Sequence, residues 1–176
     1  MAQSQSQLDP RGLKRENWGR DRPLTDFMDF QSPAQKACYE RISPWMYELF
    51  GSGVLTFGDE PLFIINFGSA VASTRVIPWE GDDALITTRS YVVTDVELTP
   101  DLTYYLLREN NGIRFGRFAL DSENDIVFEH SLVGSTCDQI ELAYSVNTVV
   151  KLADDYDDEI ANRWGGKRAL DRWSSW

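Results

Sequence analysis

The sequence is poor in the residues on which most covalent and metal chemistry depends. It contains two cysteines, Cys38 and Cys137, and one histidine, His130, among 176 residues. Two cysteines do not make a disulfide framework, and a reducing compartment is the default for such a chain. The first residues, Met-Ala-Gln-Ser-Gln-Ser-Gln, lack the apolar core of a signal peptide, and no apolar run is long enough to span a bilayer. We therefore expect a cytoplasmic protein.

Positive charge is also scarce. The net charge is −11, which disfavours nucleic acid as a partner because binding to it depends on neutralising phosphates with Lys and Arg. Residues 1–23 differ, since their five cationic and three acidic side chains leave a net charge of +2 and they have no apolar periodicity. The sequence therefore predicts a mobile tail over 1–23 and a single domain over 24–176. No glycine-rich phosphate loop is present, so we expect no nucleotide cofactor.

The clearest element is one long helix between Gly134 and Gly166. Thr136 and Gln139 have the spacing of a capping box, and the two glycines at 165 and 166 permit the left-handed backbone of a helix C-terminus. Apolar residues recur at steps of three and four, which places them on one face. They are Leu142, Val146, Val149, Ala153, Tyr156, Ile160 and Trp164.

Two further helices are expected, one starting at Ser32-Pro33 and one at Thr99-Pro100, because Ser or Thr followed by Pro is a common helix start. Pro44 predicts a kink in the first, or two short helices with Ser43 capping the second. Runs rich in β-branched and aromatic residues predict strands. They cover residues 62–67, 70–79, 85–93, 113–120 and 125–133, with a further short one at 54–57.

Short turns between these runs imply antiparallel pairing. The expected fold class is α+β, an antiparallel sheet of about five strands with helices packed on it, in the order α-β-β-β-α-β-β-α. The first and last helices are expected to cover one face of the sheet, because their apolar stripes need a surface to bury.

Several segments resemble the YbjN-like family, described as bacterial sensory transduction regulators. They are Leu98-Thr-Pro-Asp-Leu102, Leu106-Leu-Arg-Glu-Asn110, Gly116-Arg-Phe118, Asp125-Ile-Val-Phe-Glu-His-Ser-Leu132 and Ala153-Asp-Asp-Tyr-Asp-Asp-Glu-Ile160. The resemblance spans roughly residues 33–166 and implies a fold similar to that of type III secretion chaperones. It also implies polypeptide binding, often as a homodimer, and no catalytic residues.

Three features could carry chemistry instead. The acidic cluster 154–159 could hold a divalent metal, although a straight helix cannot wrap its ligands around an ion and a solvated face is the ordinary interpretation. Cys137, near the start of the long helix, could form a stabilised thiolate. His130 alternates with apolar residues on the inward side of its strand, which indicates a structural role.

We therefore predict a non-enzymatic, chaperone-like or regulatory protein-binding module without a catalytic residue, metal or cofactor. The alternative is an enzyme that uses the acidic cluster 154–159 with a divalent metal, or a redox-active Cys137. The second helix carries apolar residues on more than one side, which marks an interface. The predicted partner or dimer residues are Leu102, Tyr104, Tyr105 and Leu107.

Overall fold

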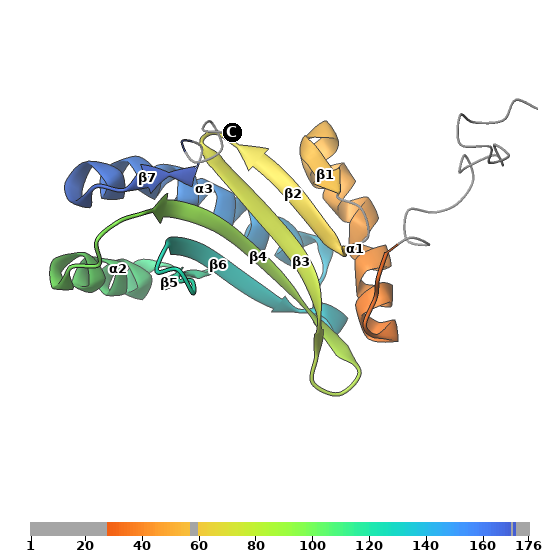
Figure 1. The fold of residues 1–176 in the computed structure, drawn as a ribbon. Coiled ribbons are helices and arrows are strands. Elements are labelled where there is room, and N and C mark those ends of the chain that lie inside the picture. Colours follow the sequence, from red (N-terminus) through yellow and green to blue (C-terminus); the bar gives the residue numbers. More distant parts are fainter. Residues whose placement is uncertain (1–27, 57–59, 170, 172–176) are drawn as a thin grey trace, which may run out of the picture.

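The structure is a computed structural model that describes residues 28–56, 60–169 and 171 (Figure 1). The predicted tail at 1–23 lies outside these residues. The elements in chain order are α1 (Pro33–Phe50), the 3₁₀ turn η2 (Gly51–Gly53), β1 (Val54–Thr56), β2 (Leu62–Phe67), β3 (Ala70–Trp79), β4 (Asp83–Thr94), α2 (Pro100–Gly112), β5 (Arg117–Leu120), β6 (Ile126–Val133), the 3₁₀ turn η3 (Gly134–Thr136), α3 (Gln139–Trp164) and β7 (Lys167–Arg168).

The strands form one antiparallel sheet in the order β1-β2-β3-β4-β6-β5, with β7 paired to the end of β4. The class is α+β as predicted, but in the described part of the chain the sheet has seven strands rather than about five. The two additional strands are β1, predicted only as a short strand beside the five, and β7. Strand β7 arises because Gly165 and Gly166 have φ values of 83° and 91°, which reverse the chain so that Arg168 pairs with Val93.

Helices α1 and α3 lie on the same face of the sheet (Figure 1). Helix α3 packs across β2, β3, β4 and β6, whereas α1 packs on β1, β3 and β4. Successive side chains along a strand alternate between this covered face and the other face. In β3, for example, Ala72, Thr74 and Val76 are buried, whereas Arg75 and Ile77 are exposed. The first and last helices therefore cover one face, as their apolar stripes predicted.

The start of α3 differs from the prediction. Its N-cap is Asp138, whose side chain accepts from the N–H of Glu141 while the Glu141 side chain accepts from the N–H of Asp138. The predicted capping box of Thr136 and Gln139 is wrong, because Thr136 belongs to η3 and its hydroxyl donates to the carbonyl of Val133. The apolar stripe is confirmed at its centre, where Val146 and Val149 are fully buried.

Helix α1 begins where predicted, with the Ser32 hydroxyl accepting from the N–H of Gln35. It then continues through Pro44 as one helix to Phe50, so the alternative of two short helices is wrong. Ile42 and Met46, on either side of the proline, are both fully buried. Packing of both halves against the sheet outweighs the hydrogen bond that proline removes.

The strand predicted over 113–120 begins only at Arg117. Gly116 has a φ of 90°, and a Cβ placed there would lie 2.6 Å from the Phe128 ring, so the chain turns and comes close to β6 at this point, just before β5 begins. As a result β5 pairs only with Ile126–Glu129, the first half of β6.

Candidate functional site

The predicted interface residues on α2 are divided between the core and the surface. Leu102 is fully buried, so it cannot contact a partner, which corrects the prediction for this residue. Tyr105 is half-buried, with its ring 5.0 Å from that of Trp164 and the Arg163 guanidinium 4.6 Å above it. Tyr104 and Leu107 are 61% and 64% exposed and line a shallow depression of about 700 Å³. Of the four, these two offer an apolar surface to a partner.

The outer edge of β5 is capped by a side chain. The Asn110 amide accepts from the N–H of Phe118 at 2.7 Å and donates to the carbonyl of Phe118 at 3.1 Å. These are the two bonds that an added strand would make to that residue. Asn110 therefore closes this edge to strand addition. No local signal in the sequence could have shown that Asn110 bonds Phe118.

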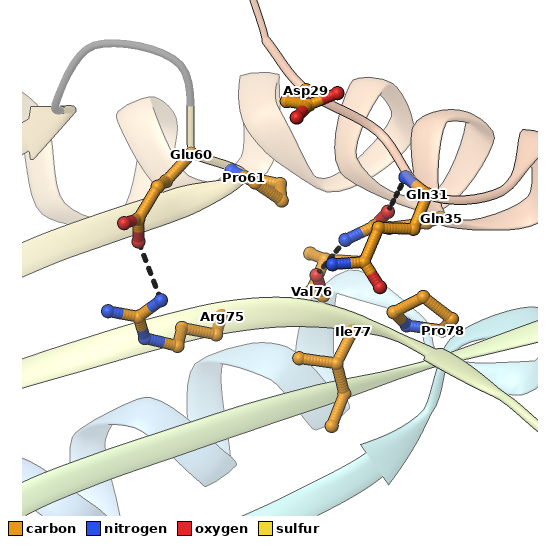
Figure 2. A pocket seen from close by; sticks show the side chains of 9 residues that line it. All are labelled: Asp29, Gln31, Gln35, Glu60, Pro61, Arg75, Val76, Ile77 and Pro78. Atoms are coloured by element: carbon orange, nitrogen blue, oxygen red, sulfur yellow. Dashed lines mark hydrogen bonds and ion pairs between the residues drawn. The ribbon is translucent and has the colours of Figure 1, made fainter.

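The part of β3 that extends beyond β2 is closed in a similar way (Figure 2). The carbonyl of Val76 accepts from Gln35 Nε2 at 2.7 Å, and its N–H donates to the carbonyl of Pro61 at 3.0 Å. Pro78, two residues on, has no N–H. The pocket of about 500 Å³ at this place is also bridged by Arg75 and Glu60, 2.6 Å apart. The N–H and carbonyl of Val76 at this edge are therefore already bonded within the protein.

Among the described residues, no strand pairs with the outer side of the second half of β6. The N–H and carbonyl of Phe118 point away from β6, so those of its partner Phe128 point to β4. Along an antiparallel strand these groups point to alternate sides from one residue to the next. Three residues after Phe128, the N–H and carbonyl of Ser131 therefore point outward, away from β4. Ser131 is exposed. The next outward carbonyl, that of Val133, already accepts from the N–H of Cys137 at 3.1 Å. An uncapped strand edge thus remains at Ser131.

Large apolar side chains lie near this edge: Phe115 contacts the ring of His130 next to Ser131, Tyr144 stacks on Phe115, and Ile140 lies four residues before Tyr144 on α3. Phe115 is 48% exposed, Tyr144 61% and Ile140 66%. The rings of Phe115 and Tyr144 stack with centroids 6.3 Å apart. We call Phe115, Ile140, Tyr144 and the edge residue Ser131 the β6 edge site. The sequence did not identify this site, because its members come from a loop, a helix and a strand.

His130 lies beside the β6 edge site. Its Nδ1 is 2.8 Å from the Ser145 hydroxyl oxygen on α3, and its ring meets the edge of Phe115 at 5.9 Å. Burial, followed by the nearby Arg117 guanidinium, lowers the pKa of His130 below its usual 6.5. The residue therefore joins β6 to α3 in its neutral form, which fits the predicted structural role.

The acidic cluster 154–159 is divided among different partners. Asp154 and Asp157 point to Ser69 in the β2–β3 turn, whereas Asp158 pairs with Arg168 at 2.9 Å and Glu159 with Arg163 at 2.8 Å. Within the described part of the chain, no group of three or more His, Cys, Asp or Glu residues is placed to hold a metal ion. The structure offers no support for the predicted alternative of a metal enzyme.

Cys137 is buried and precedes α3 rather than lying within its first turn. Burial, followed by the Glu141 carboxylate, raises the pKa of its thiol to about 11. The helix dipole therefore does not produce the thiolate on which the redox alternative depended.

No helix in the described ranges is long and apolar enough to cross a membrane. A family model described as "T3SS (YopN, CesT) and YbjN peptide-binding chaperone 1" matches residues 40–172 of the 176. No curated protein matches the chain. The family match covers every strand and includes the β6 edge site and the exposed side of α2.

Proposed function

The chain belongs to the family of T3SS (YopN, CesT) and YbjN peptide-binding chaperones, and from this premise we propose that it is a non-enzymatic protein that holds an extended segment of a polypeptide partner at the β6 edge site. The observation that carries the location is the exposed Ser131, whose N–H and carbonyl face outward on a side of β6 without a strand. Two other outward positions of the sheet are already used within the protein, Phe118 of β5 by Asn110 and Val76 of β3 by Gln35.

A strand edge selects its ligand by backbone chemistry. Its N–H and carbonyl groups match those of an extended peptide, while flanking pockets read alternate side chains of that peptide. Phe115, Tyr144 and Ile140 supply an apolar wall on the α3 side of the edge. The net charge of −11 favours peptides that carry Lys or Arg and makes their binding weaken as salt concentration rises.

The test uses peptides selected on the full chain from a random-sequence phage library. Ser131→Pro removes the outward N–H without breaking the β4–β6 ladder, and a proline is tolerated where the N–H faces solvent. Ser131→Ala is the matched control because it keeps the N–H. Fluorescence polarisation is expected to show at least about tenfold weaker peptide binding for Ser131→Pro and an unchanged affinity for Ser131→Ala.

Two results contradict the proposal. If no peptide is selected, the peptide-binding function itself is refuted. If Ser131→Pro folds, as judged by circular dichroism, and binds selected peptides as the wild type does, the β6 edge site is not where they bind.

We also propose that the protein is a homodimer assembled through α2. Tyr104 and Leu107 are the exposed apolar residues of this helix, and Arg108 donates to the Tyr104 hydroxyl at 3.0 Å, which holds the ring in place. Exposed apolar side chains close together on one helix are typical of an interface. A two-fold contact would bring the same surface from both copies together.

Light scattering at tens of micromolar is expected to give twice the 20.1 kDa mass of the chain. Tyr104→Glu/Leu107→Glu is expected to give a monomer, because burying four carboxylates across a two-fold contact is too costly. Ile140→Glu/Tyr144→Glu adds the same charges to equally exposed positions of α3 and is expected to leave the dimer intact. A monomeric wild type would refute the homodimer, and a dimer that survives the α2 variant would refute this interface.

A further inference from the structure

The β2–β3 turn lies tightly against α3 through two carboxyl groups. Asp154 Oδ1 accepts from the N–H of Ser69 at 2.5 Å and lies 2.6 Å from the Ser69 hydroxyl oxygen. Asp157 Oδ2 lies 2.6 Å from that same hydroxyl oxygen. Gly68 has a φ of 55°, and a Cβ there would lie 2.3 Å from the Asp154 carboxylate, so only glycine permits this approach.

The three side chains are short of one proton when both acids are ionised. A serine hydroxyl has a single hydrogen and can donate to only one of the two carboxylates. The oxygen of the other carboxylate would then lie 2.6 Å from a lone pair of the Ser69 hydroxyl oxygen, with no hydrogen between them. The contacts become consistent when one acid is protonated, so that it donates to the Ser69 oxygen while the Ser69 hydroxyl donates to the second acid.

The surroundings decide which acid holds the proton. Asp157 is 2% exposed, and its Oδ1 is buried without a hydrogen-bond partner, so its charge would be poorly solvated. Asp154 is only half-buried and accepts from the Ser69 N–H, which favours its charged form. The chain of donors therefore runs from Asp157 through Ser69 to Asp154.

We propose that Asp157 is a proton-binding switch: in its protonated form it fastens the β2–β3 turn to α3 through the Ser69 hydroxyl, and its ionisation weakens that attachment, leaving the turn held by the bond from the Ser69 N–H to Asp154. Two other charged groups face Asp157. The neighbouring Asp158 carboxylate opposes ionisation, and Arg168 on β7, paired with Asp158 at 2.9 Å, favours it. Burial outweighs the Ser69 hydrogen bond, a hydrogen bond from the Asp158 backbone and the charge of Arg168, and it raises the pKa of Asp157 above its ordinary 3.8.

The direction of the pH effect follows from these positions. A carboxyl group with a raised pKa binds more protons in the folded state, so its stabilisation is complete below pH 3.8 and is lost as the pH rises through the folded value. Asp154 acts in the opposite direction and in another window, because hydrogen bonds from Ser69 lower its pKa and its contribution is lost only below pH 3.8.

The experiment compares the wild type with Asp157→Asn, whose amide donates to Ser69 at every pH. Between pH 3.8 and the folded pKa of Asp157, the unfolding equilibrium constant of the wild type is expected to rise by up to about tenfold per pH unit relative to that of Asp157→Asn. Asp155→Asn, an exposed acid on the same helix, is the control and is expected to keep the wild-type profile.

A second measurement on the unaltered chain does not depend on how the variant folds. Carboxyl-carbon NMR is expected to show Asp157 titrating above 3.8, with the Ser69 amide resonance shifting at the same pH. Coincident unfolding profiles for the wild type and Asp157→Asn would overturn the proposal, as would an Asp157 that titrates at or below 3.8.

Discussion

Asn110 and Gln35 each use an amide side chain to satisfy backbone groups at an edge of the sheet. Asn110 bonds both the N–H and the carbonyl of Phe118, and Gln35 joins the carbonyl of Val76 to the N–H of Gln31. An amide has a donor and an acceptor side by side, as a peptide group does, so it can replace a neighbouring strand. These two residues close the sheet edge at Phe118 and at Val76.

Asn110→Ala is predicted to destabilise the fold and to open the β5 edge. Leaving the Phe118 N–H and carbonyl without partners is expected to cost about 1–3 kcal/mol of unfolding free energy, measured by urea denaturation. Light scattering is expected to show slow association through the freed edge. Asn111→Ala, at an exposed neighbouring position, is the control. Equal stability of the two variants would show that Asn110 does not serve as a cap.

At the scale of elements, α3 holds the two halves of the core together. Its first half contributes Leu142 and Val146 to a cluster that includes Ile42 and Met46 of α1. From Val149 onward, it contributes residues to a separate cluster with β4, β6 and α2. A helix of 26 residues is long enough to reach both, and neither cluster is complete without it.

Val149→Asp is therefore predicted to unfold the domain or leave it without fixed packing. Val149 is fully buried, and an unpaired buried carboxylate costs several kcal/mol, which is comparable with the whole stability of a domain of this size. Thermal unfolding followed by near-UV circular dichroism is the measurement. Asn147→Asp, at an exposed position two residues earlier, is expected to melt like the wild type. A cooperative transition close to wild type for Val149→Asp would contradict the assigned helix face.

At the scale of the whole molecule, charge is distributed unevenly along the chain. Residues 1–23 carry a net charge of +2 and the remaining chain −13. The described residues already contain both core clusters, and the family match begins only at residue 40. The charge and composition of the first 23 residues do not suit them to add to that core.

Deletion of residues 1–23 is predicted to leave folding intact. The melting temperature is expected to stay within a few degrees of that of the full chain, because no apolar periodicity in this segment could pack on the domain. Differential scanning calorimetry of both proteins at equal concentration is the check. A larger decrease would mean that the segment docks on the domain.

Local patterns in the sequence were sufficient for most elements. Runs rich in β-branched and aromatic residues predicted β2 and β3 with their observed bounds, and the stripe through Val146 and Val149 predicted the buried face of α3. Glycines at 165 and 166 correctly marked its end. These features depend on neighbours within a few residues, where side-chain period and backbone freedom act directly. The family resemblance, too, rested on such segments and is confirmed by the match over residues 40–172.

Tertiary structure alone decided the features that depend on distant parts of the chain. Thr136 and Asp138 are both acceptable caps, and only the turn after β6 selects Asp138. Strand β7 exists because the reversed chain meets the free end of β4. The β6 edge site and the Asp157–Ser69 contact join residues more than ten positions apart, and burial sets their chemistry. A periodic pattern records which face is apolar, but it does not record what that face will meet.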